Sequence, residues 1–540
     1  LCALPPEPAT FDETAALAVS RLPADSLTRL VAAGLVEAAG SGRYRLHPAI
    51  TDYCRLGGIG PLVLRRLADH TRELLSRAQG SPAELERDLP VIQAGLDAAL
   101  GDAPSEGFVD LTLALLKPVD QLGAWALAEP YWTKAENWAR QEFDRERLLG
   151  IQAARAQAAL HLAAFTDAEC FAMEGLMLAL EMDDARQAAR MFQTLGAVAF
   201  NRGDHTAAES SYRNGLRQAE AEDLDNERCA LQANLASVHL VRGQFESAQS
   251  LLDQALQLAR RLGDVRREAS ILMNLGVVAA QTGDRAQAAR AFEESLELSQ
   301  KTGSWEQRLF LLVNLGALAS DEGQLSLARA RFEEALVLAH QLGDRVRICL
   351  LLGNLGSIMM QQGNLEAAAS RLEQGIGLAR AIGQPEALAL LLTNAGELDL
   401  RQGQAGLAED RLREALHLAD QVGQPRLQAA AQCGLANVLL NEGRVEDAEG
   451  LYRSSLELAS RSGLRLTEAE AEFGLARVEL GQGKKASARR RGKHSLELVL
   501  GHSPALEVEV REWIAGLERR KRLPAAPASQ ARGGTVPGEG

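Results

Sequence analysis

The chain has 540 residues, with 58 Lys and Arg against 72 Asp and Glu, 46% hydrophobic residues, 4% aromatic residues and 48 Gly. This composition supports a large apolar core and excludes a wholly disordered chain. The net charge of −14 also disfavours the wrapping of DNA along the body of the protein.

The chain carries no signal for the membrane or for secretion. No apolar run reaches the roughly 18 residues of a spanning helix, and the most apolar stretch, 349–360, is interrupted by Asn354. The start, Leu1 to Pro6, lacks the basic segment and cleavage site of a signal peptide. The six Cys are scattered without a C-x-x-C pair, which predicts small core side chains in a reducing compartment. We expect a cytoplasmic protein. The missing initiator Met indicates a processed chain or a fragment of a longer one.

Residues 1–56 predict a small unit of helix, helix, hairpin and helix. A capping box over Thr10–Glu13 opens a helix through Ser20, and Asp25 caps a second helix that Gly34 ends. The strands 35–38 and 43–46 pair across 40–42, and the last helix runs from 48 to 53.

This unit resembles the winged-helix module that follows the nucleotide-binding domain of NB-ARC-type STAND ATPases. The residues that carry the resemblance are Leu30, 34–36, 42–48 and Tyr53. The resemblance implies that His47 senses the phosphates of ADP bound to an upstream domain, although Pro48 stands where the commonest version has Asp. An ordinary histidine at the end of a strand is the alternative. A DNA-reading wing is disfavoured because this unit has only five Lys or Arg.

Residues 57–108 predict a helical connector of less regular pattern. Its segment 84–98 resembles the connector between winged helix and repeats in the same ATPases.

A repeat of forty residues occupies most of the remaining chain. Glycine recurs at positions 203, 243, 283, 323, 363, 403, 443 and 483. Ala follows five residues later each time, and Leu or Ile stands eight residues after that Ala. The pattern extends backwards in weaker form, which gives about ten copies over 109–500.

Each copy predicts two helices. Apolar spacing of i, i+4 and i+7 defines the first helix, which ends at the recurrent glycine, and the second helix follows directly. A further glycine, at 263, 303, 343, 383, 423 and 463, closes the second helix as a left-handed residue. One such unit buries a single face, so successive units must stack into an all-α solenoid.

The N-x-G and G-x-x-x-x-A-x-x-x-F arrangement resembles the tetratricopeptide repeat, although the period alone would also suit HEAT or armadillo arrays. The resemblance implies a superhelix in which Gly276 and Ala288 allow the two helices to cross closely, while Phe292 packs against the next repeat. The repeat length of forty residues resembles that of the lengthened tetratricopeptide repeats in kinesin light chains and bacterial signalling ATPases.

Asparagine occupies one position of the first helix in five successive copies, at Asn234, Asn274, Asn314, Asn354 and Asn394. By resemblance to kinesin-light-chain-like repeats, this ladder faces the concave groove and holds the backbone of an extended peptide. The alternative is that these amides bond between repeats and stabilise the superhelix. The neighbouring positions vary and would supply selectivity: Ser237, Gln281, Asp321, Gln361, Glu397 and Arg401.

No motif predicts catalysis. The sequence lacks a phosphate loop of the form G-x-x-x-x-G-K-[ST], the H-E-x-x-H pattern and a nucleophile elbow in its strand-turn-helix context. We therefore predict a protein that is not an enzyme, without a cofactor or a metal site. An ATPase domain upstream of this chain stays compatible with that prediction.

The end of the chain is basic. Residues 484–522 carry a net charge of +6, which fits a solvated capping helix over 501–522 or, as an alternative, contact with nucleic acid or an acidic partner. Residues 523–540 predict a disordered tail.

These patterns lead to one functional interpretation: a non-catalytic scaffold that binds a protein or peptide and forms the sensor region of a STAND-type regulator. A free-standing adaptor without a link to an ATPase is the alternative.

Overall fold

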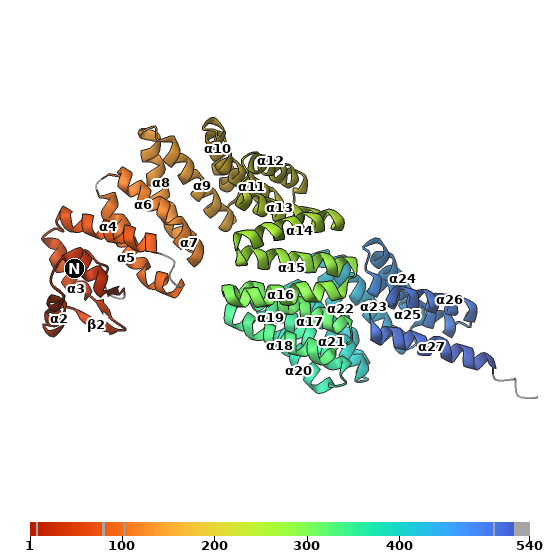
Figure 1. Cartoon of the computed structure of the whole chain (residues 1–540). Helices are drawn as coiled ribbons and strands as arrows, with labels where there is room; N and C mark the ends of the chain where they lie inside the picture. The colour runs from red at the N-terminus through yellow and green to blue at the C-terminus, as the bar shows by residue number, and fades with distance from the viewer. Residues whose placement is uncertain (7–8, 78–81, 102, 501–502, 523–540) are drawn as a thin grey trace, which may run out of the picture. The chain divides into compact units, whose positions relative to one another are not determined.

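The structure is a computed structural model that describes residues 1–540 except 7–8, 78–81, 102, 501–502 and 523–540 (Figure 1). The predicted disordered tail therefore lies outside the described residues. The chain divides into two compact units, Leu1–Asp264 and Val265–Gly540, which are described separately. This division falls between two helix pairs of the repeat array, and the domain boundaries given above stay predictions.

The N-terminal part of unit 1 is a small β/α unit built around three short strands. Its elements are β1 Phe11–Asp12, α1 Glu13–Ser20, α2 Ala24–Ala32, β2 Glu37–Gly40, β3 Arg43–Arg45 and α3 Pro48–Leu56. The sheet has the order β1-β3-β2 with antiparallel pairs, and Tyr44 lies opposite both Phe11 and Ala38. The hairpin and three helices expected from the sequence are present, and β1 is an additional strand.

Two predicted helix caps are wrong. Asp12, not Thr10, caps α1, because its Oδ1 accepts a hydrogen bond from the Ala15 N–H at 2.7 Å. The Thr10 hydroxyl instead accepts from Arg43 Nε at 2.8 Å, because β1 places Thr10 beside β3. Helix α2 begins at Ala24 without a side-chain cap, and Asp25 in its first turn pairs with Arg29 at 2.8 Å.

Two longer helices, α4 Pro61–Arg77 and α5 Pro82–Leu100, connect this unit to the array. They pack against each other, and α4 also contacts α1. Arg43 of β3 bridges to Asp88 of α5 at 2.8 Å, which fastens the sheet to the connector.

From Glu106 to Val499 the described helices form ten consecutive pairs, four in unit 1 and six in unit 2. The first helices are α6 Glu106–Ala114 with α7 Leu116–Leu122, α9 Arg145–His161, α11 Ala185–Asn201, α13 Asp225–Val241, α15 Val265–Thr282, α17 Trp305–Asp321, α19 Arg345–Gln361, α21 Pro385–Arg401, α23 Pro425–Asn441 and α25 Arg465–Gly481.

The second helices are α8 Trp125–Gln141, α10 Phe165–Glu181, α12 His205–Ala221, α14 Phe245–Leu262, α16 Arg285–Thr302, α18 Leu325–Leu342, α20 Leu365–Ile382, α22 Ala405–Val422, α24 Val445–Arg461 and α26 Lys485–Val499. Helix α27 Pro504–Arg522 packs on α26 at the end of the array. Each helix of the array contacts its partner within the pair, so the all-α repeat architecture predicted from the sequence is confirmed. A membrane-crossing helix is not found in the described part of the chain, where each helix is too short or too polar.

The turns between helices use left-handed residues. The recurrent glycines at 203 to 483 have φ between +71° and +88°, and those at 263 to 463 have φ between +67° and +70°. Their predicted role as helix terminators is confirmed. In the first copies the equivalent positions hold Phe143, Ala163, Asp183 and Asp223, which adopt φ between +50° and +56° despite their side chains. The stacking of the array therefore imposes the turn even where the sequence lacks glycine.

The glycine inside the first helix lies under a large side chain of its partner helix. A β-carbon on Gly276 would lie 2.5 Å from the Phe292 ring, sixteen residues later in the chain. The same spacing relates Gly316 to Phe332, where the distance would be 2.6 Å, and it recurs for Gly196, Gly356 and Gly396. No side chain larger than hydrogen fits these crossings, so the predicted close approach of the two helices is confirmed.

A polar network joins the first and second pairs. Arg155 and Glu136 occupy positions that hold Leu in most other copies, and they form an ion pair that is largely shielded from solvent. The Arg155 guanidinium also lies 4.0 Å from the centre of the Phe171 ring. Gln152, which is fully buried, donates to Glu174 at 2.9 Å. Helices α8, α9 and α10 are thus joined by charge pairing as well as apolar contact.

The cysteines fulfil the expectation of core side chains only in part. Cys229, Cys349 and Cys433 are buried, whereas Cys54 and Cys170 are exposed and Cys2 is half-buried. The exposed pair lies on the outer sides of α3 and α10, which a count of cysteines in the sequence cannot distinguish from inner sides.

Replacement of Gly276 by Ala should lower the free energy of unfolding by about 1–3 kcal/mol, because the new methyl group overlaps the Phe292 ring. Urea unfolding followed by circular dichroism measures the change.

The matched control is Gly377→Ala in α20, where a β-carbon would meet no atom within 4 Å. That variant should gain about 0.5–1 kcal/mol from reduced chain entropy. Equal effects of the two variants would contradict the proposed crossing.

Candidate functional site

The five asparagines predicted to form a ladder lie at equivalent positions of consecutive first helices. Asn234 is in α13 of unit 1, and Asn274, Asn314, Asn354 and Asn394 are in α15, α17, α19 and α21 of unit 2. All five are half-buried. Each of the four in unit 2 precedes a Gly of close helix crossing by two residues, so its side chain points away from the partner helix, because two residues turn an α-helix by about 200°.

The hydrogen bonds divide the five amides into two groups. Asn394 Nδ2 donates to the carbonyl of Gly353 in the preceding first helix at 3.3 Å, and Asn314 Nδ2 donates to Phe310 in its own helix at 2.8 Å. Among the residues that the structure describes, the side chains of Asn234, Asn274 and Asn354 form no hydrogen bond. One amide thus links neighbouring repeats, and three keep their full capacity for a ligand or water.

An apolar row runs beside the ladder in unit 2 and was not predicted from the sequence. Phe310, Leu350 and Leu390 each lie four residues before an Asn of the ladder, which places them on the same side of their helices. Phe310 and Leu350 are each 38% exposed, so both offer apolar surface beside the amides. We call the surface formed by Asn274, Asn314, Asn354 and Asn394 with this row the Asn face. The sequence signal for this row is a large apolar residue four positions before Asn314, Asn354 and Asn394.

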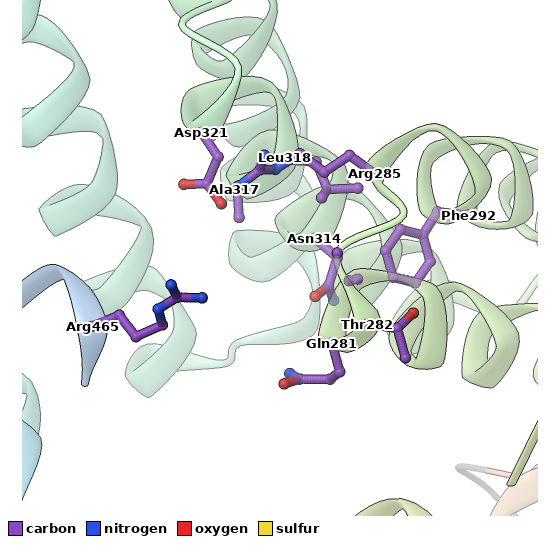
Figure 2. A pocket seen from close by; sticks show the side chains of 11 residues that line it. Gln281, Thr282, Arg285, Phe292, Asn314, Ala317, Leu318, Asp321 and Arg465 are labelled. Atoms are coloured by element: carbon purple, nitrogen blue, oxygen red, sulfur yellow. The ribbon is translucent and has the colours of Figure 1, made fainter. Parts of the chain in front are cut away.

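A cavity of about 380 Å³ opens at the α15 and α17 end of the Asn face. Three residues predicted as binding candidates, Gln281, Asn314 and Asp321, line it together (Figure 2). Phe292 contributes an edge of the cavity as well as covering Gly276, so its predicted contact with the next repeat is accompanied by one within its own pair.

Two cationic residues of this cavity were missed by the sequence reasoning. Arg285 begins α16, and Arg465 begins α25, far along the chain. Figure 2 shows the Arg465 side chain reaching toward the cavity from a separate helix. Pro504 at the start of α27 likewise returns to Gly323, where a β-carbon would lie 3.6 Å from the proline. Unit 2 therefore curves so that its last repeats approach α17. The sequence pattern of a single repeat does not predict such a contact.

The other predicted selectivity residues do not line this cavity. Gln361 is exposed at the end of α19, and Arg401 pairs with Glu397 at 2.6 Å on α21. The Ser237 hydroxyl donates to Ala233 of its own helix at 3.1 Å. Among the described residues, no three His, Cys, Asp or Glu side chains are grouped so that they could hold a metal ion.

A perturbed carboxyl group marks the far end of unit 2. Glu470 in α25 occupies the repeat position of Phe310 and Leu350. Burial, and then the negative charges of Glu397 and Glu509, raise the pKa of the Glu470 carboxyl to about 7. Three acidic side chains from α21, α25 and α27 thus converge, so ionisation of Glu470 opposes the folded state near neutral pH.

His47 in the N-terminal unit caps helix α3. Its Nδ1 accepts a hydrogen bond from the Ala49 N–H at 3.2 Å, and the side chain is exposed. This cap gives His47 a structural role, and its role toward a nucleotide stays a prediction.

Glu470→Gln should make the stability of the protein less dependent on pH. Because the folded pKa is raised, the neutral carboxyl contributes stability fully below the unfolded pKa of about 4.3, and this is lost as the pH rises through about 7. The wild type should lose at most about 3 kcal/mol between pH 4.5 and 7.5 from this group, and the variant should not. Urea midpoints across this range measure the difference; parallel profiles of the two proteins would refute the assignment.

The sequence matches a family model described as "Tetratricopeptide repeat" over residues 227–301, 267–341 and 427–500. No curated protein gives a significant match to the chain.

Solved structures similar to this one include the apo form of RapI, with 16% identity, a TM-score of 0.53, and coverage of 66% of this chain and 98% of that chain. The apo form of the quorum sensor NprR from B. thuringiensis gives 16% identity, a TM-score of 0.50 and coverage of 65% and 97%. A STAND protein with a tetratricopeptide repeat sensor from Pyrococcus horikoshii gives 14% identity, a TM-score of 0.48, and coverage of 84% of this chain and 62% of that chain.

At these identities the first two likenesses concern the fold alone, and they agree with the family match and with the glycine-marked helix pairs. The chain therefore contains tetratricopeptide repeats, which the family model matches over residues 227–341 and 427–500.

Proposed function

We propose that the Asn face binds an extended peptide or an extended segment of a partner protein. The observation that carries this proposal is the pair of half-buried amides of Asn274 and Asn354, which form no hydrogen bond within the described chain, beside exposed Phe310 and Leu350. An amide offers both donors and an acceptor, so it can hold a peptide backbone irrespective of the side chains. The apolar row then provides contact area for alternate side chains of the peptide.

The cavity beside Asn314 supplies charge selectivity. It exposes the Arg465 guanidinium from α25 and the Asp321 carboxylate from α17, so it suits a ligand that carries groups of both charges. An acidic side chain or a peptide carboxylate would pair with Arg465 by charge-assisted hydrogen bonds. Because Arg465 comes from a distant repeat, such a ligand would also join the two ends of unit 2.

We further propose that this chain is the sensor region of a STAND-type regulator. The support is the helix, helix, hairpin and helix order of residues 1–56, its sequence resemblance to the winged helix of such ATPases, and the position of His47 at the end of the hairpin. In this view the ligand alters the curvature of the repeats and releases the winged helix from an upstream nucleotide-binding domain. NprR, whose fold is similar, is described as a quorum sensor.

A free-standing adaptor is the second candidate, favoured by the cap that already engages His47. Reading the gene upstream of Leu1 separates the two. A phosphate loop a few hundred residues earlier supports the regulator, and a nearby start codon supports the adaptor.

Simultaneous replacement of Asn274, Asn314 and Asn354 by Ala should weaken peptide binding by at least tenfold while helicity and the unfolding midpoint stay within error. Peptides selected from a display library on the full chain serve as probes, and isothermal titration gives the affinities. Asn394→Ala is the contrasting variant, since loss of its bond to Gly353 should lower stability by about 1 kcal/mol. Loss of folding in the triple variant would instead support a structural ladder.

Arg465→Ala should reduce the affinity for selected peptides that carry an acidic group by about tenfold, and Arg465→Lys should retain part of it, because a lysine keeps the charge without the bidentate geometry. Peptides without an acidic group should bind all three proteins alike. Identical affinity of every peptide for wild type and Arg465→Ala would remove Arg465 from the site.

A further inference from the structure

Helix α10 in unit 1 carries an exposed apolar row on its outer side. Met173, Met177 and Leu180 are 54%, 63% and 47% exposed. Their spacing of i, i+4 and i+7 places the three side chains on one side of the helix over about two turns. A surface helix of an array normally presents polar residues there, because this side contacts no other repeat.

Comparison with the other copies shows that this row is specific to α10. The position of Met173 holds Thr133 in α8, Arg213 in α12, and Asp, Glu, Arg or Lys in every later second helix. The positions of Met177 and Leu180 are likewise polar or glycine in most copies. The repeat therefore does not require apolar residues here, and the exposed row of α10 needs another explanation than packing.

The apolar surface continues at the loop before α9. Phe143 is 89% exposed and adopts a left-handed backbone with φ of +55°, an unfavourable conformation for a bulky residue. The ion pair between Arg145 and Glu181, at 3.2 Å, holds this loop against the end of α10. Phe143 therefore belongs to the loop that this ion pair joins to the end of α10, and we call Phe143, Met173, Met177 and Leu180 the α10 face.

Basic residues border the α10 face on both sides. On α12, Arg213 and Arg217 stand at the repeat positions of Met173 and Met177, and on α8 the exposed residues include Lys134 and Arg140. Arg213 pairs with Glu209 at 2.7 Å, and Arg140 pairs with both Glu136 at 2.6 Å and Glu174 at 2.5 Å. The position of Leu180 holds the acidic Glu220 on α12. Arg217 and Lys134, which form no ion pair among the described residues, carry the positive charge of this border.

This border bears on which partner can cover the face. If a second copy packed on it, a two-fold axis would bring α12 against α12 or against α8, and basic residues would meet basic residues in either case. A partner whose apolar side is edged with acidic residues would instead form favourable charge interactions with the basic residues at both borders.

We propose that the α10 face binds an amphipathic helix of a partner protein that has apolar residues at i, i+4 and i+7 and acidic residues at its edges. Methionine suits such a contact, because its flexible and polarisable side chain adapts to the shape of the partner. The exposed length of about two turns sets the length of helix that the face can hold. This surface is separate from the Asn face and does not depend on the peptide-binding proposal.

The test uses the full chain and two designed eighteen-residue helical peptides that share one leucine row and differ in having Glu or Lys at every edge position. Fluorescence anisotropy should show that the Glu peptide binds the wild type at least tenfold more tightly than the Lys peptide. Met173→Gln with Met177→Gln should reduce the affinity for the Glu peptide at least tenfold.

The matched control is Val337→Gln, which removes an exposed apolar residue at the position of Met177 in another repeat, α18, and should leave the affinity unchanged. Arg213→Glu with Arg217→Glu should reverse the preference between the two peptides. The proposal is overturned if neither peptide binds, if both bind equally, or if sedimentation shows a dimer that the Met173→Gln, Met177→Gln variant abolishes. Circular dichroism confirms that the exposed substitutions leave the fold intact.

Discussion

The contact between a glycine in five of the first helices and a large side chain of the partner helix determines much of this structure. Because no β-carbon fits between Gly276 and Phe292, the two helices cross closely, and the same crossing recurs at Gly316, Gly356 and Gly396. The Asn two residues earlier is then turned to the opposite side of its helix. The packing of the array and the location of the Asn face therefore follow from one steric constraint.

The features predicted from the sequence are those encoded by local repetition. The period of forty residues and its glycines specify the helix pairs, the left-handed turns and the ladder register, because each depends on residues within one copy. The cap of α1 shows the limit of local rules. Asp12 caps this helix, because the pairing of β1 with β3 places the Thr10 hydroxyl in a hydrogen bond with Arg43.

Contacts between distant copies could not be predicted. Arg465 reaches the cavity near Asn314 only because unit 2 curves, and curvature accumulates from small rotations at every repeat that no single residue reports. The network around Arg155 and Glu136 could not be predicted for a different reason. These two residues replace the Leu of the repeat, and the repeat pattern indicates only what the copies share. The α10 face was not predicted for the same reason, because its row of apolar residues occurs in one copy only.

The two proposed surfaces would bind their partners through different interactions. On the Asn face, neutral amides and apolar side chains would recognise an extended chain with little dependence on its sequence, and Arg465 with Asp321 would add charge selectivity at one end. On the α10 face, affinity would come from apolar area and orientation from the basic border. One array can in this way hold two partners of unlike conformation.

The left-handed turns at Phe143, Ala163, Asp183 and Asp223 give the array an uneven distribution of stability. Each costs roughly 1 kcal/mol that glycine would avoid, and all four lie in unit 1, whereas the turns of unit 2 use glycine. In a solenoid each repeat is supported only by its neighbours, so local opening is concentrated where this strain accumulates. Helix α10 lies between two of these turns. A partner on its outer side would therefore also suppress the opening of the least stable repeats, coupling recognition to local order.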